Sequence, residues 1–128
     1  GETSNYFRHD MLHLLMKRAL STLSTLQNIS KDIYPQTLLK PEIAFANTAD
    51  FLKARIPAAS EYDVVAEKCR IYKELIAYYQ LVDNKDAVLL TELERLEYTK
   101  QQFQETNANE WENIQKKERY PHRPQSLP

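Results

Sequence analysis

Glycine is nearly absent from this sequence. It occurs once among the 128 residues, at position 1. Glycine supplies positive φ angles and lets a backbone approach phosphates closely. Its scarcity therefore argues against a phosphate-binding Walker loop, a dinucleotide-binding fold, a strained nucleophile elbow and two-residue hairpins. We predict an all-α protein.

Cysteine and long apolar runs are also scarce. The single cysteine, Cys69, cannot form an internal disulfide or a thiolate zinc site, which is typical of an intracellular chain. No stretch of the sequence reaches the 18 or more consecutive apolar residues of a membrane span, and the charged start is unlike a signal peptide. These features predict an intracellular protein, located in the cytoplasm.

Charge of either sign is balanced. Seventeen Lys and Arg face eighteen Asp and Glu, which leaves a net charge of -1 and no long-range attraction to nucleic acid or anionic lipid. The 42% hydrophobic and 27% charged residues are ordinary for a globular protein. We expect one helical domain over residues 1–119, followed by an extended proline-rich tail over residues 120–128, and no nucleic-acid partner.

Prolines divide the chain into helical windows. Prolines 35, 41, 57, 121, 124 and 128 leave long segments between them with helical periodicity. The first predicted helix runs from Asn5 to Ile33, and a second begins at Pro41 and ends at Pro57. The apolar residues of the first window recur every three or four positions and predict a core-facing stripe: Leu12, Leu15, Ala19, Thr22, Leu26, Ile29 and Ile33.

The second half of the chain predicts two further helices. Ser60 followed by Asp63 resembles a capping box and marks the start of the third helix. A polar turn at residues 83–86 implies an antiparallel helical hairpin. The fourth helix is expected from Asp86 to Arg119, with Leu89, Leu90, Leu93 and Leu96 facing the core. The predicted architecture is a four-helix bundle-like domain whose long C-terminal helix projects beyond the bundle.

Residues with catalytic or metal-binding chemistry are few. His9 and His13 can share a helix face, but two nitrogen ligands do not make a site, and no Glu-x-x-His occurs. Cys69 falls within the apolar stripe of the third helix, where a thiol behaves as a small hydrophobe with a raised pKa. The glutamates at 92, 94 and 97 are expected on a solvated face. We assign no catalytic residue, cofactor or metal and expect no enzyme activity.

The far half of the fourth helix is the predicted partner-binding surface. Its apolar residues fit a coiled-coil seam with polar positions that fix register, and a lone tryptophan on a polar helix is a common binding anchor. A solvated overhang is the alternative. Tyr78 is either the flank of a wide core or part of an exposed aromatic patch. The predicted contact residues are Phe103, Asn107, Trp111, Ile114 and Tyr78.

Basic residues gather near the end of the chain. Lys116, Lys117, Arg119 and Arg123 can complement a helix dipole or contact phosphate and anionic lipid headgroups. The leading hypothesis is a non-catalytic helical protein-protein interaction module, an adaptor or subunit of a larger intracellular assembly, with self-association as one form of that interaction. The alternative is a peripheral membrane-binding module that uses these basic residues together with Lys17 and Arg18.

Overall fold

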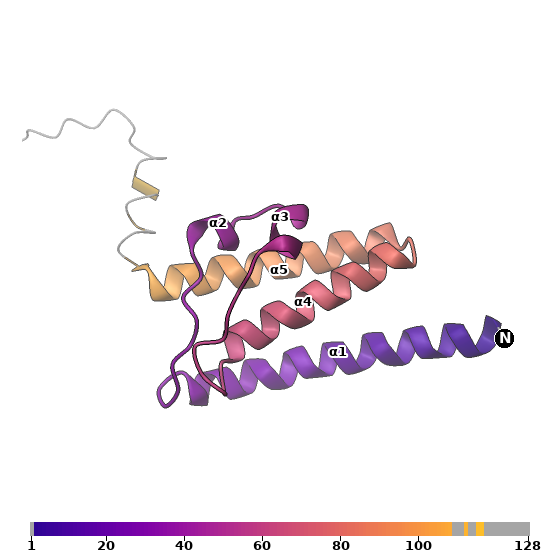
Figure 1. The fold of residues 1–128 in the computed structure, drawn as a ribbon, viewed down its shortest axis with the longest axis horizontal. Helices are drawn as coiled ribbons and strands as arrows, with labels where there is room; N and C mark the ends of the chain where they lie inside the picture. The colour runs from indigo at the N-terminus through magenta and orange to yellow at the C-terminus, as the bar shows by residue number, and fades with distance from the viewer. Residues whose placement is uncertain (1, 109–111, 113–114, 117–128) are drawn as a thin grey trace, which may run out of the picture.

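The computed structural model describes the backbone of residues 2–108, 112 and 115–116, with side chains from residue 11 onward. Within that range the chain forms helices and no strand, which confirms the all-α prediction. The elements are α1 (Glu2–Ser30), α2 (Pro41–Ala44), α3 (Thr48–Lys53), α4 (Val64–Leu81) and α5 (Lys85–Thr106) (Figure 1). Three of these helices are long and two are short, so the expected four-helix architecture is not confirmed.

The α4–α5 hairpin lies between α1 on one side and the short helices α2 and α3 on the other (Figure 1). Helix α4 is antiparallel to α1, because Lys68 contacts Ser24 while Tyr79 contacts His13. Helix α5 is parallel to α1, since Lys17 bonds to Glu94 and Gln27 to Gln102. The core therefore lies where α4 packs against α1 and α5.

The expected second helix is divided into α2 and α3. The break follows from Asn47, whose side chain accepts a hydrogen bond from the Asp50 N–H at 2.8 Å and so caps a new helix. This restart turns the ring of Phe51 into the core, where it is fully buried. A single continuous helix between Pro41 and Pro57 was therefore a wrong expectation.

Helix α4 begins later than the sequence pattern suggested. Asp63, rather than Ser60, is its N-cap and accepts from the Ala66 N–H at 3.0 Å. The predicted apolar stripe of α4 is confirmed, because Val65, Cys69, Tyr72, Ile76 and Tyr79 are all buried. Burial raises the pKa of the Cys69 thiol to about 12, so this side chain is a protonated small hydrophobe at neutral pH.

Helix α5 is turned the opposite way from the prediction. Of the four leucines expected in the core, Leu96 is half-buried and the other three are largely exposed, with 60% of Leu89, 62% of Leu90 and 56% of Leu93 accessible. The face directed inward is mainly polar and consists of Thr91, Glu92, Arg95, Tyr98, Thr99, Gln102 and Phe103. Glu92 is thus buried rather than solvated. The helix also ends at Thr106, with Asn107 as its C-cap, so a continuous helix to Arg119 is not confirmed.

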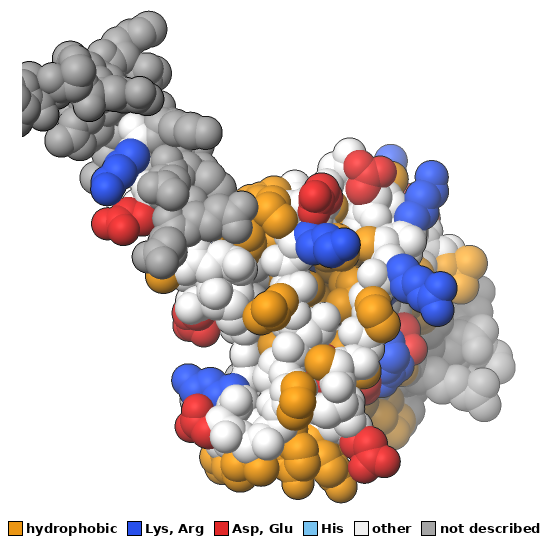
Figure 2. All heavy atoms as spheres, turned by 60° about the vertical axis from the view of Figure 1, so that its left-hand side comes forward, with side chains coloured by type: hydrophobic (Ala, Val, Ile, Leu, Met, Phe, Trp, Pro, Cys, Tyr) orange, Lys and Arg blue, Asp and Glu red, His pale blue; other side chains and the backbone are white. Residues whose placement is uncertain are grey.

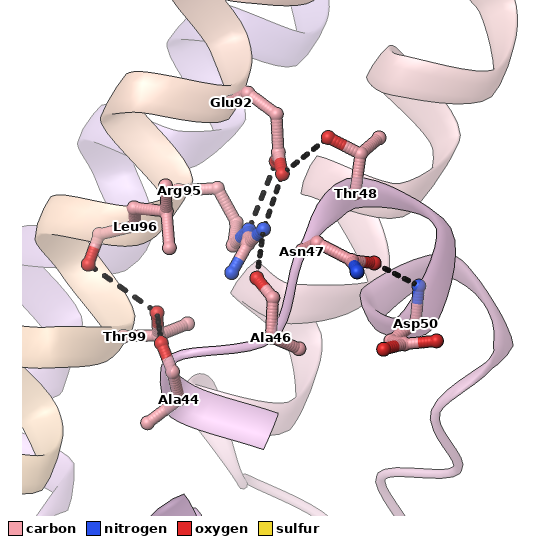
Figure 3. A network of polar contacts seen from close by, with 9 residues as sticks. All are labelled: Ala44, Ala46, Asn47, Thr48, Asp50, Glu92, Arg95, Leu96 and Thr99. Atoms are coloured by element: carbon pink, nitrogen blue, oxygen red, sulfur yellow. Dashed lines mark hydrogen bonds and ion pairs between the residues drawn. The ribbon is translucent and has the colours of Figure 1, made fainter. Parts of the chain in front are cut away.

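A buried ion pair explains this orientation of α5 (Figure 3). The Arg95 side chain is fully buried and its Nε donates to Glu92 Oε2 at 2.9 Å. Its Nη2 donates to Glu92 Oε1 and, at 2.8 Å, to the carbonyl of Ala46. Thr48 donates to the same carboxylate at 2.7 Å, and Thr99 donates to the carbonyl of Ala44 at 2.7 Å. The segment from α2 to α3 is therefore bound to the polar face of α5.

Removing one partner of this ion pair should destabilise the fold strongly. In Arg95→Met the buried Glu92 carboxylate loses its cation, so we expect a loss of about 3 to 5 kcal/mol in the free energy of unfolding, measured by chemical denaturation. Arg70→Met is the control, because Arg70 pairs with Glu67 and Glu74 at the surface and should cost about 1 kcal/mol or less. Equal effects of the two substitutions would contradict this role for Arg95.

Candidate interaction surface

Helix α1 carries two apolar faces. Its inner face packs on the core through Met16, Leu20 and Leu23. The stripe that the sequence predicted for the core lies mostly on the opposite side, so that prediction was wrong. Six large side chains of α1 and its C-terminal turn are 46% to 66% exposed, and we call them the outer stripe: Met11, Leu14, Leu15, Leu26, Ile29 and Ile33.

Polar contacts to α4 and α5 fix the rotation of α1. Gln27 Nε2 donates to Gln102 Oε1 at 2.8 Å, and its Oε1 accepts from the Tyr98 hydroxyl at 3.0 Å. Lys68 donates to Ser24 Oγ at 2.8 Å, and its ammonium lies 3.9 Å from the centre of the Tyr98 ring. Burial lowers the pKa of Lys68. Because these buried polar groups would lose their partners if α1 rotated, the outer stripe is held toward solvent.

An apolar groove of about 620 Å³ lies beside the C-terminal half of the outer stripe. One wall is formed by Leu26, Ile29 and Ile33, and the other by the segment from Ile56 to Val64. The rings of Tyr34 and Tyr62, which also line the groove, contact each other at a tilt of 47° with centroids 4.6 Å apart. Figure 2 brings this end of the molecule forward and shows clusters of exposed hydrophobic side chains, with a large one along the lower edge.

Hydrogen bonds between two loops shape the groove before any ligand binds. Asp63 Oδ2 accepts from the backbone N–H groups of Thr37 and Ala59, both at 2.8 Å. Gln36 accepts from the Val64 N–H at 2.8 Å and donates to the Tyr62 carbonyl at 3.0 Å. Since these bonds join the segments before and after α2 and α3, the wall of the groove is preorganised.

Several charged side chains at the rim of the groove are held by polar contacts. Arg70 bonds to Glu67 and Glu74, and the hydrogen bond from Arg70 lowers the pKa of Glu67. Lys73 donates to the carbonyl of Ala54. The groove therefore offers apolar surface bordered by charged side chains, of which Glu61 is exposed and Arg70 is paired.

Among the described residues, the predicted contact residues Phe103, Asn107 and Tyr78 do not form an exposed surface of this kind. Phe103 is 1% exposed and meets the Phe45 ring edge-on in the core, so it is not available to a partner. Asn107 is half-buried at the end of α5, and Tyr78 packs against the core beside Tyr79. Trp111 and Ile114 lie outside the described residues.

Of the basic residues of the membrane alternative, the structure describes Lys17, Arg18 and Lys116. Lys116 is exposed, whereas Lys117, Arg119 and Arg123 lie outside the described residues. Lys17 forms an ion pair with Glu94 at 2.6 Å. Among the described residues, no helix is long and apolar enough to cross a membrane, and no group of three or more His, Cys, Asp or Glu is arranged to hold a metal ion.

No protein-family model, curated protein or solved structure matches the chain. Function is therefore inferred from the geometry of the outer stripe and the groove. The sequence did contain a signal for this surface. Met16, Leu20 and Leu23 form a second apolar series at helical spacing. A helix with two apolar faces can bury only one of them against a small core, so the other face stays exposed.

Asp63 should contribute more to stability than Ser60, the residue first expected to cap α4. Asp63→Ala removes the acceptor of three backbone N–H groups, so we expect a cost of about 3 kcal/mol by chemical denaturation. Ser60→Ala removes one hydrogen bond to the Pro35 carbonyl and should cost about 1 kcal/mol or less. A larger effect of Ser60→Ala would contradict the arrangement described for the groove wall.

Proposed function

We propose that the protein is a non-catalytic helical protein-protein interaction module, an adaptor or subunit of a larger assembly, and that it binds through the outer stripe and the groove. The observation that carries this proposal is the outer stripe itself, six large apolar side chains at 46% to 66% exposure on one face. Soluble monomers rarely expose contiguous apolar patches larger than a few hundred Å². A partner protein that covers this face removes it from water.

The dimensions of the surface favour a helical partner. From Met11 to Ile29 the stripe follows α1 for 18 residues, which at 1.5 Å per residue is about 27 Å. An amphipathic helix presents apolar side chains every three or four residues and buries them in a groove of this kind. A compact small molecule would fill the groove and leave the N-terminal half of the stripe exposed.

The peripheral-membrane alternative has less support. Binding to anionic lipid needs cations beside the apolar face, at about 1 kcal/mol for each basic residue near the membrane. Lys17 forms an ion pair with Glu94, and Arg18 is the exposed cation beside the N-terminal half of the stripe. At the other end, Arg70 is paired with Glu67 and Glu74, and Lys73 donates to the carbonyl of Ala54.

A charge placed on the outer stripe should abolish binding without unfolding the protein. Ile29 is 61% exposed, so Ile29→Glu should change the free energy of unfolding by about 0.5 kcal/mol or less. We expect capture of protein partners by the tagged chain to fall at least tenfold, measured by quantitative mass spectrometry, because a desolvated carboxylate would face apolar groups.

Leu81→Glu is the matched control for this experiment. Leu81 is 83% exposed and ends α4 at the α4–α5 turn, at the opposite end of the hairpin from the groove (Figure 1). Its substitution adds the same charge and should leave capture unchanged. Unchanged capture by Ile29→Glu would contradict the proposed surface, whereas salt-sensitive flotation of the wild type with anionic vesicles would favour the membrane alternative.

A further inference from the structure

Four of the six residues of the outer stripe are arranged in symmetric pairs about Thr22. Leu15 and Ile29 each lie seven residues from Thr22, and Met11 and Ile33 each lie eleven residues from it. An antiparallel pair of identical helices related by a two-fold axis at Thr22 places equally distant residues opposite each other. These four residues would therefore face apolar residues of a second copy, while Leu14 would face Ser30 and Leu26 would face Arg18.

We propose that the occupant of this surface is a second copy of the chain, with its α1 packed antiparallel against α1. This inference rests on the proposed function and names the partner. Leu15 packs against the partner's Ile29, and Met11 packs against the partner's Ile33. Both contacts occur twice, once on each side of the two-fold axis, as an isologous interface requires.

The hollows of the surface fit the same arrangement. The groove lies at the C-terminal half of the stripe and is lined by Ile29, Tyr34 and Tyr62 among others. A shallower hollow lies at the N-terminal half, beside Leu14 and Leu15. Antiparallel pairing brings the N-terminal side chains of each copy over the groove of the other, so both hollows are filled by apolar groups.

The available area is close to what a stable dimer needs. Six half-exposed side chains of leucine size offer about 100 Å² each, or about 600 Å² for each copy. Arg18, Thr22 and Thr25 are exposed on the same face and add their stems to the contact. The total approaches the roughly 800 Å² per partner of a standard specific interface.

The centre of the stripe permits close approach. Thr22 and Thr25 carry short side chains there, which suits an interaxial distance of about 8 to 10 Å. Arg18 is exposed on the same face of α1 as the stripe, and in the dimer its stem packs against the partner's Leu26 while the two Arg18 residues lie eight residues apart along the axis. That separation is about 12 Å, beyond the roughly 8 Å Debye length at physiological salt, so their repulsion is screened.

Complementary charges test both the surface and its register. In sedimentation experiments at protein concentrations from about 2 to about 200 µM, the wild-type protein should become dimeric. A dissociation constant of this size is at the weak end for interfaces of this area. Leu15→Glu and Ile29→Lys should each raise the dimer dissociation constant at least tenfold. An equimolar mixture of these two variants should dimerise again, because the introduced carboxylate of one chain faces the introduced ammonium of the other. Leu81→Glu, the control, should remain dimeric.

Each other outcome overturns the dimer. A wild type that stays monomeric over this range excludes it, and dimers that survive both single substitutions lie on another surface. Variants that stay monomeric in the mixture exclude the antiparallel register, provided that circular dichroism shows both to be folded. A monomeric wild type whose partner capture is still lost in Ile29→Glu overturns the dimer alone and leaves the proposed function standing.

Discussion

The buried pair of Arg95 and Glu92 joins the inward face of α5 to the segment between α2 and α3. A guanidinium that is fully buried must be paired and hydrogen-bonded, because an isolated charge in the protein interior is very costly. Its partners lie on α5 itself and on the Ala46 carbonyl between α2 and α3. The polar face of α5 therefore turns inward, and Leu89, Leu90 and Leu93 on the opposite face are left in solvent.

Polar contacts on the inward face also set the orientation of α1 against α4 and α5. Its inner face combines Leu20 and Leu23 with Gln27, and Gln27 bonds to two residues of α5. Since the polar contacts and the shorter apolar series share one face, the longer apolar series is directed outward. The exposed stripe is thus a consequence of how the core is built, and it leaves a preorganised face on which a partner can bind.

Local pattern predicted part of this structure, and contacts between distant segments decided the rest. The all-α class and the buried stripe of α4 with Cys69 depend on proline positions and helical period, so the sequence was sufficient for them. The orientation of α5 depends on Arg95 meeting a carbonyl 49 residues earlier, which periodicity does not register. The groove was missed for the same reason, because its walls come from residues 23–34 and 56–73. Phe103 was mistaken for a surface residue because Phe45, the ring it packs against, is also remote in the sequence.

The orientation of α1 can be tested directly by thiol labelling of Leu20→Cys and Ile29→Cys. In dilute folded protein, we predict fast labelling at position 29, which is 61% exposed, and slow labelling at position 20, which is 6% exposed. Native Cys69 is a buried internal reference, since burial raises its pKa to about 12 and keeps the thiol protonated. Raising the protein concentration should then protect position 29. Slow labelling at position 29 in dilute protein, or fast labelling at position 20, would contradict the account.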